Sequence, residues 1–529
     1  MPHFSPVVLG IAFAALVVAL TALARRLPVP TPILQVAAGL LVALAPGAVV
    51  PQLDPDIVFV VFLPPILWAA AFFTSLREFK ANRRPITTLA VGLVLATTIA
   101  VALVARALLP GLPWAVAVAL GAIVSPPDAV AAAAIVSRLP VPRQVIVILE
   151  GESLVNDASA LVLYRTAVAA AVTGTFSWGE SIVRFFIDAG VGSLVGLLVC
   201  WLIMRALRLT RDSLGETLLT LTGPYLAWVL AESLHVSAVL ACVAGGLYMR
   251  QHLPTAVGAM SRLQTRSVWD LLVFLLNAAI FILLGAQFGG LLREVPHESI
   301  GRVVLLGVSV AAVVIVVRLV WVPVALALPH HLRVGGRRRR ARTPDALLQW
   351  KPLTLIGWTS MRGIVSLATA LALPRLLASG APFPYRPEII LITMGVIVMT
   401  LVLQGLTLAP LIRAFHFAPE ATRTEEETLA RREAARRGAE ALEDMSREPW
   451  VDRRDVDWLR TELRDRVKLL DHHGGAPDGR RRLRAGMIRA ERRMLVRLRN
   501  EGAISDDVLR ELEQELDLES VRVGAGDDR

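Results

Sequence analysis

Charged residues are scarce in this chain. Only 19% of the residues are Asp, Glu, Lys or Arg, 55% are hydrophobic, and the mean hydropathy is +0.59. Soluble domains are closer to one quarter charged, so this balance indicates a membrane protein. Cysteine is almost absent: Cys200 and Cys242 both lie in apolar stretches, which leaves no disulfide framework beyond one pair. A secreted enzyme, a nucleic-acid-binding protein and a single-pass receptor are all poor fits.

The charges that are present divide the chain into two unlike parts. The net charge is +11 over 529 residues. Residues 419–529 hold about 24 basic and about 27 acidic residues, which leaves about 31 and about 17 for residues 1–418. Apolar residues of the charged part recur at helical spacing, as at Val456, Leu459 and Leu463, without a catalytic motif. We predict a transmembrane domain over 1–418 and a cytoplasmic helical tail over 419–529.

Apolar runs long enough to cross a bilayer recur throughout the first part. A helix needs about 17–25 residues to cross ~30 Å of hydrocarbon. About thirteen such runs occur: 7–24, 31–50, 57–74, 87–106, 114–136, 144–172, 182–206, 215–232, 235–250, 270–290, 301–327, 353–378 and 388–413. They predict an all-α polytopic membrane protein with about 13 transmembrane helices.

The loop charges predict the orientation of these helices. Arg25 and Arg26 follow the first run and no Lys or Arg precedes it, which favours a retained helix with its N-terminus outside over a cleaved signal. Alternating from there, the inner loops hold about 21 basic residues and the outer connections about 6. We therefore expect the plasma (inner) membrane, with the C-terminus in the cytoplasm. The basic run Arg337–Arg340 with Arg342 fits a topology signal or anionic-lipid contact better than nucleic-acid binding.

Two of the runs contain residues that oppose a continuous helix. Pro126 and Pro127 lie mid-run, directly before Asp128, and remove backbone donors. A second break, from Gly357 to Gly363, lies in the twelfth run. Such backbone survives in a membrane only where it is buried in protein or lines a cavity. Two broken helices, one in each half, predict an inverted-repeat transporter with a mid-membrane site; a simple proline kink capped by Asp128 is the plainer alternative.

Polar residues cluster in the sixth run. Ser153 and Asp157 are four positions apart on a helix, and Glu152 and Asn156 form the next row. One face therefore carries oxygen groups at membrane depth, which suit one monovalent cation or one proton. Intramembrane carboxylates are costly, so an ion-binding role is favoured over a polar patch that joins helices. Arg362, in the second break, also needs a buried partner, and we expect Glu152 to be that partner.

At these residues the chain resembles the monovalent cation:proton antiporter superfamily, within it the sodium/proton exchanger branch with an Asn-Asp pair. The resemblance covers about residues 5–415, most of the chain. The motifs that carry it are Glu150-Gly-Glu-Ser-Leu-Val-Asn-Asp157, Phe62-Leu-Pro-Pro-Ile, Trp269-Asp270 to Asn277, and Met361-Arg-Gly-Ile-Val-Ser366.

The resemblance implies a role for each matching residue. Asp157 would bind the monovalent cation and the proton in turn, with Ser153 as a further ligand. Asn156 would be its uncharged neighbour, in the place where the electrogenic branch has a second aspartate. Asp128 would lie where two unwound helices cross and would stabilise their ends. Glu152 and Arg362 would form a structural ion pair across the core.

The chain departs from the family pattern at two places. Pro127-Asp128-Ala129 stands where Thr-Asp-Pro is frequent, so a threonine hydroxyl is missing. Trp68-Ala69-Ala70 stands where Phe-Glu-Ala often follows Leu-Pro-Pro, so a carboxylate is missing. Both changes bear on the preference for Na+ over K+, and neither touches Asp157.

We therefore expect a secondary transporter and not an enzyme. It would exchange Na+ (or Li+ or K+) for H+ without net charge movement, for pH and sodium homeostasis. The resemblance implies a homodimer in the lipid bilayer with no cofactor beyond the transported ions and no nucleic-acid partner. A K+-preferring antiporter is the first alternative. A cation channel and a membrane sensor are weaker ones, because one titratable carboxylate is no selectivity filter and the tail lacks signalling motifs.

Overall fold

Helices make up the regular structure of the chain. A computed structural model describes residues 6–27, 29–45, 57–136, 139–174, 178–210, 212–294, 297–331, 349–417, 421–448, 450–471, 477–501 and 506–523. Within these ranges the only β pairing is an isolated bridge between Leu376 and Pro382. The predicted all-α fold is confirmed. The contacts divide the chain into two compact units, Met1–Ala418 and Pro419–Arg529.

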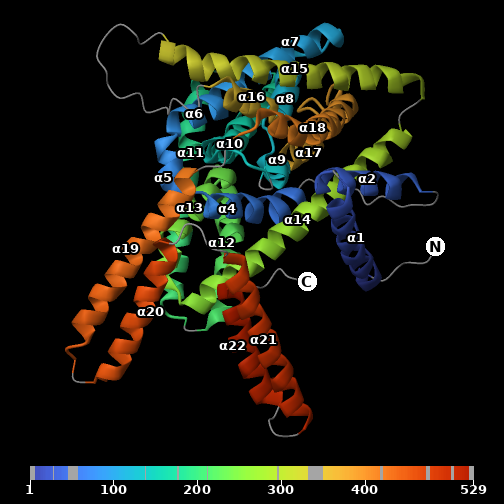
Figure 1. The fold of residues 1–529 in the computed structure, drawn as a ribbon. Coiled ribbons are helices and arrows are strands. Elements are labelled where there is room, and N and C mark those ends of the chain that lie inside the picture. Colours follow the sequence, from blue (N-terminus) through green and yellow to red (C-terminus); the bar gives the residue numbers. More distant parts are fainter. Residues whose placement is uncertain are drawn as a thin grey trace. The chain divides into compact units, whose positions relative to one another are not determined.

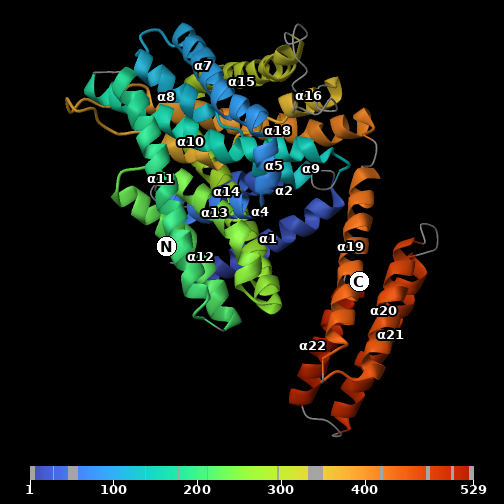
Figure 2. The same cartoon turned by 90° about the vertical axis from the view of Figure 1, so that its left-hand side faces the viewer.

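The first unit is a bundle of long and short helices (Figures 1 and 2). In chain order they are α1 (Pro6–Arg26), α2 (Thr31–Leu44), η1 (Val58–Phe62), α4 (Leu63–Phe73), α5 (Leu76–Ala81), α6 (Arg83–Thr87), η2 (Thr88–Leu93), α7 (Val94–Leu108), α8 (Trp114–Val124), α9 (Ala129–Val136), α10 (Arg143–Thr173), α11 (Trp178–Leu207), α12 (Ser213–Ser233), α13 (Ala238–Ala256), α14 (Ala259–Glu294), α15 (His297–His331), α16 (Trp350–Trp358), α17 (Ile364–Leu371) and α18 (Arg386–Phe415).

Each predicted apolar run overlaps one of these helices or a broken pair of them within the described residues. Five described segments are long and apolar enough to cross a membrane by themselves: Arg83–Leu108, Phe186–Leu207, Ala259–Leu291, Val304–Leu326 and Arg386–Phe415. The count of about 13 crossings stays a prediction. The basic run Arg337–Arg340 with Arg342 lies outside the described residues.

Local sequence sets several helix boundaries. The Asp212 side chain accepts a hydrogen bond from the Gly215 backbone N–H at 2.8 Å and so caps the start of α12. Ser237 caps the start of α13 in the same way. Pro64 and Pro65, at the start of α4, lack a backbone N–H, and η1 directly before them is a π-helix.

Both predicted interruptions are present. α8 ends at Val124 and α9 begins at Ala129, with the two prolines between them. α16 ends at Trp358 and α17 begins at Ile364. α8 packs against α7, α10 and α17, and α18 runs alongside α15 and α17, so the two breaks are held inside the bundle. This arrangement meets the condition that non-helical backbone be buried in protein.

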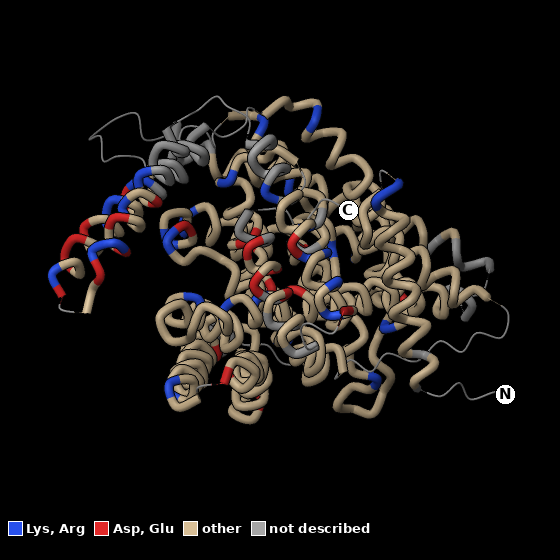
Figure 3. The backbone as a smooth tube through the Cα atoms, turned by 60° about the horizontal axis from the view of Figure 1, so that its bottom comes forward, with Lys and Arg blue, Asp and Glu red and all other residues tan. Residues whose placement is uncertain are grey.

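The second unit consists of α19 (Ala421–Met445), α20 (Arg453–Asp471), α21 (Pro477–Asn500) and α22 (Asp506–Val523). α19 packs against α20, and α21 packs against α22 (Figures 1 and 2). Lys, Arg, Asp and Glu crowd these helices, whereas they are sparse in the first unit (Figure 3). Ion pairs join the helices of each pair, as between Arg460 and Glu443 at 2.7 Å. The hydrogen bond that Arg436 donates to Glu433, together with the charges of Glu433 and Glu440, raises the pKa of Arg436.

Candidate cation and proton site

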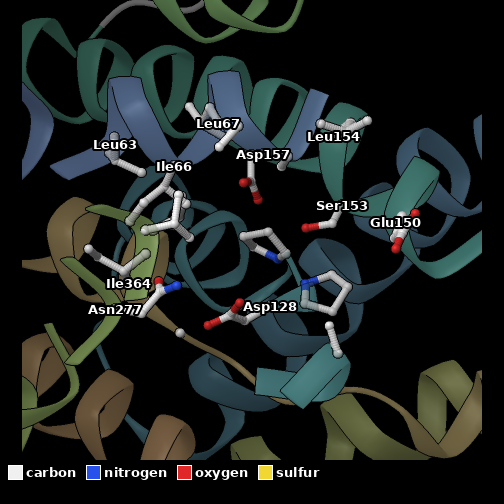
Figure 4. Close-up of a pocket in the computed structure, with 18 of the residues that line it drawn as sticks. Leu63, Ile66, Leu67, Asp128, Glu150, Ser153, Leu154, Asp157, Asn277 and Ile364 are labelled. Atoms are coloured by element: carbon white, nitrogen blue, oxygen red, sulfur yellow. The ribbon is translucent and has the colours of Figure 1, made fainter. Parts of the chain in front are cut away.

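A cavity of about 280 Å³ lies beside the two breaks (Figure 4). Its wall is made by α4, the α8–α9 break, α10, α14 and the start of α17. Three of the four predicted ion-site residues line it: Asp157, Ser153 and Asp128. The fourth, Asn156, is fully buried and is not among the lining residues. Its amide nitrogen and oxygen have no hydrogen-bond partner among the residues that the structure describes.

Asp157 is the buried carboxylate of this cavity. Its side chain points into the cavity from α10, with Asp128 on the other side (Figure 4). Asp157 is only 7% exposed, and it makes no hydrogen bond or ion pair with any residue in the described part of the chain. A buried carboxylate without a protein partner needs another source of neutralisation. A bound proton or a bound cation supplies it.

Asp128 lies where the two breaks meet. Its backbone N–H donates to the carbonyl of Met361 at 2.6 Å, which ties one break to the other. α9 begins directly after Asp128, and a Cβ atom on Gly363, the residue before α17, would overlap the Asp128 carboxylate. The carboxylate is therefore next to two helix N-termini, whose partial positive charge stabilises an anion. The chain requires glycine at 363 because of this close approach.

Arg362 neutralises the C-terminal end of α8. Its Nε donates to the carbonyl of Val124 at 2.8 Å and its Nη2 to the carbonyl of Ser125 at 3.1 Å. Its Nη1 donates to the carbonyl and hydroxyl oxygens of Ser360. Because the helix stops at Val124, the N–H groups of residues 128 and 129 do not reach these carbonyls, and that of Asp128 donates to Met361 instead. A cation at a helix C-terminus is favourable. All three guanidinium nitrogens of Arg362 are thus used on the two breaks.

The ion pair predicted between Glu152 and Arg362 is wrong. Glu152 pairs with Arg318 of α15 through two hydrogen bonds: Nη1 donates to Oε1, and Nη2 donates to Oε2 at 2.7 Å. Both side chains are 1% exposed. Arg318 Nε also donates to the carbonyl of Ile356 at 3.0 Å, near the C-terminus of α16. Each broken helix therefore has its own arginine, and only Arg318 has a carboxylate partner within the described part of the chain.

Side chains of α18 hold the second break in place. Thr400 Oγ1 accepts from the backbone N–H of Arg362 at 3.1 Å, and Gln404 Oε1 accepts from that of Ser360 at 3.2 Å. Sequence reasoning did not assign these supports, because polar residues inside an apolar run give no partner. The sequence signal that could have found Thr400 and Gln404 is their polar side chains within the apolar run 388–413, and the structure shows that both are buried.

The cavity also contains polar residues that the sequence did not single out as site residues. Asn277 of α14 lines it opposite Glu150 of α10 (Figure 4). Ser366 of α17 lines it as well, with a buried hydroxyl that has no hydrogen-bond partner among the described residues. Ala69, where a carboxylate is frequent in the family pattern, lies in the same wall. The missing carboxylate is therefore a difference within the cavity itself.

Comparison with known proteins decides the family. The model of the transmembrane sodium/hydrogen exchanger family matches residues 12–414. The chain belongs to the sodium/hydrogen exchanger family. This exchanger is 35% identical over 525 residues to an uncharacterized Na+/H+ exchanger of Mycobacterium bovis, covering 97% of this chain and 95% of the relative. A Bacillus pumilus antiporter, named for sodium, potassium, lithium and rubidium against H+, is 33% identical over 72% of this chain and 57% of its own.

The fold of this exchanger is similar to that of a solved antiporter. It matches the sodium proton antiporter MjNhaP1 of Methanocaldococcus jannaschii with a TM-score of 0.59, covering 77% of this chain and 97% of that one at 20% identity. The predicted family and helical fold are thus confirmed. The exchanger is a multi-pass membrane transporter for Na+ and H+ and not an enzyme.

Proposed function

We propose that the exchanger couples Na+ and H+ by competition for one carboxylate, that of Asp157. The observation that carries this proposal is the isolation of Asp157: it is buried, it faces the cavity, and no described residue pairs with it. Burial favours the neutral acid, whereas a bound cation favours the carboxylate. Proton and cation therefore exclude each other, and the movement of one requires the release of the other.

Ser153 and Asp128 complete the proposed site. Both line the cavity with Asp157, and hydroxyl and carboxylate oxygens suit a hard monovalent cation. Asp128 would act chiefly through the positive helix ends beside it. Asn156 would support the site from outside the cavity, since it is buried behind the lining. No cofactor is needed, because the chemistry is ion exchange at oxygen ligands.

The exchange would move one cation for one proton, without net charge. Asn156 brings no second charge beside Asp157, and Ala69 brings none from α4. The preferred cation would be Na+, as in the family name. A K+-accepting exchanger is the second candidate, because the Bacillus pumilus relative is named for potassium among other cations.

The cavity would open to the cytoplasm. It reaches Phe73 and Thr74 at the end of α4 and Glu150 near the start of α10. Beside these ends lie Arg77 and Lys80 on the short helix α5 and Arg143 at the first position of α10, and basic connecting segments lie inside. The exchanger would thus sit in the plasma membrane with its N-terminus outside and its tail in the cytoplasm. There it would act as a homodimer in pH and sodium homeostasis.

The test is exchange by the purified full chain in proteoliposomes. Asp157→Asn should abolish Na+-dependent proton movement while the protein stays folded, because the amide fills the same volume but does not titrate. Asp188→Asn on α11, outside the cavity wall, is the matched control and should exchange normally. An imposed membrane potential should leave the exchange equilibrium of the unsubstituted chain unmoved. Exchange by Asp157→Asn, or a Na+ gradient driven by potential alone, would contradict the one-carboxylate mechanism.

A further inference from the structure

Glu150 is a carboxylate of the cavity that the exchange mechanism above does not use. It lines the same cavity as Asp157 and lies at the end of the cavity away from Asn277 (Figure 4). On α10 it precedes Ser153 by three positions and Asp157 by seven, so the three share one face of the helix. At about 1.5 Å per residue, Glu150 is about 10 Å from Asp157 along the helix axis, with Ser153 between them.

Glu150 has no paired counter-ion among the residues that the structure describes. The nearest basic group along the helix, Arg143, is already held by Glu78 of α5: its Nε donates to Oε1 at 2.6 Å and its Nη2 to Oε2 at 3.0 Å. Glu150 is half-buried and makes no hydrogen bond or ion pair with any residue within the described ranges. A carboxylate that lines a cavity and makes no direct ion pair can attract a mobile cation.

We propose that Glu150 is a second ion-binding residue of the exchanger, which takes the cation at the cavity entrance and passes it through Ser153 to Asp157. The inference rests on the proposed function of Asp157. Arg143 and Glu78 act on Glu150 with charges of opposite sign, and because the two are paired with each other, their effects on Glu150 oppose one another. The step moves an ion between oxygen ligands, and no covalent bond forms or breaks.

The experiment measures the apparent KM for Na+ and the maximal exchange rate in proteoliposomes of the full chain. Glu150→Gln should raise the apparent KM about ten- to twentyfold, the effect of one charge about 10 Å away at an effective dielectric constant of about 20. Exchange should persist at saturating Na+. Glu388→Gln, at the start of α18 and outside the cavity wall, is the matched control and should leave the KM unchanged.

A charge-restoration experiment separates an ion-binding role from a structural one. Both native cysteines, Cys200 and Cys242, are buried, so Glu150→Cys provides the accessible thiol. A methanethiosulfonate reagent with a negative charge should return the KM toward that of the unsubstituted chain. A reagent of similar size with a positive charge should raise it further. Glu150→Asp, which keeps the charge, should bind Na+ nearly as well as the unsubstituted chain.

The outcomes distinguish this inference from the proposed function. The entrance role of Glu150 is overturned, while Asp157 keeps its role, if Glu150→Gln leaves the KM unchanged. The same holds if thiol reagents on the Glu150→Cys variant leave the KM unchanged, or if reagents of opposite sign act alike. If Glu150→Gln abolishes exchange and Asp157→Asn does not, both the entrance role of Glu150 and the proposed function of Asp157 are contradicted.

Discussion

At the scale of single residues, the pair of Glu152 and Arg318 gives a prediction about folding. Removing one partner leaves the other charge buried and alone, at a cost of about 3–5 kcal/mol. Glu152→Gln and Arg318→Gln should each lower the melting temperature in detergent and the membrane yield, and the double variant should recover part of the loss. In contrast, the losses of melting temperature caused by Glu152→Gln and Arg362→Gln should nearly add in the double variant, because Arg362 caps α8 and is not the partner of Glu152. If the loss of melting temperature in the Glu152–Arg318 double variant equals the sum of the losses in the two single variants, the pairing is contradicted.

Local spacing predicts which residues share one face of a helix. Asp157 and Ser153 are one helical turn apart, so their common position on the cavity wall follows from periodicity. The partner of Glu152 does not follow, because Arg318 is 166 positions away. Arg165, Arg318 and Arg362 all lie in apolar runs. A single sequence gives no spatial distances, so it cannot show which of these arginines is the partner of Glu152.

At the scale of elements, the crossing of the two breaks depends on Gly363. A Cβ atom there would overlap the Asp128 carboxylate and press the start of α17 away from the break after α8. Gly363→Ala should therefore destabilise the exchanger by about 1–3 kcal/mol, the usual cost of overpacking, and slow exchange through the displacement of Asp128. Gly190→Ala on α11 is the control, since nothing lies within 4 Å of its added Cβ atom. Equal melting temperatures and exchange rates for the two variants would show that the crossing has room to adjust.

The breaks themselves could be predicted because their causes are local. Two prolines before Asp128 end α8 whatever surrounds it. With the seventh apolar run set aside, both breaks fall in the fifth of six runs, which fits the inverted repeat that remains a prediction. What local sequence could not show is how the carbonyls freed by each break are satisfied. That depends on Arg362, Arg318 and the side chains of α18, which reach the breaks from other parts of the fold.

At the scale of the whole molecule, charge and sequence similarity separate the two units. The family model ends at residue 414, close to the boundary between the units at Ala418. Figure 3 shows the dense charge of α19–α22 beyond it. The alignment with the Mycobacterium bovis relative covers 97% of the chain, so it includes most of the second unit. The second unit thus recurs in a relative, although every residue of the proposed ion path lies in the first.

Truncation after Ala418 tests whether the second unit takes part in transport. The first unit contains the cavity, both breaks and their arginine supports, and it has its own buried core. The paired helices of the second unit bury apolar residues such as Ala435, Leu442 and Val456 and contribute none to the cavity wall. The truncated chain should therefore insert, keep its melting temperature and exchange Na+ for H+ with an apparent KM close to that of the full chain. A change confined to the maximal rate or to its pH dependence would give the tail a regulatory role, because binding at Asp157 would be intact. A well-folded truncated chain that no longer binds or exchanges Na+ would show that the second unit is needed for the transport cycle itself.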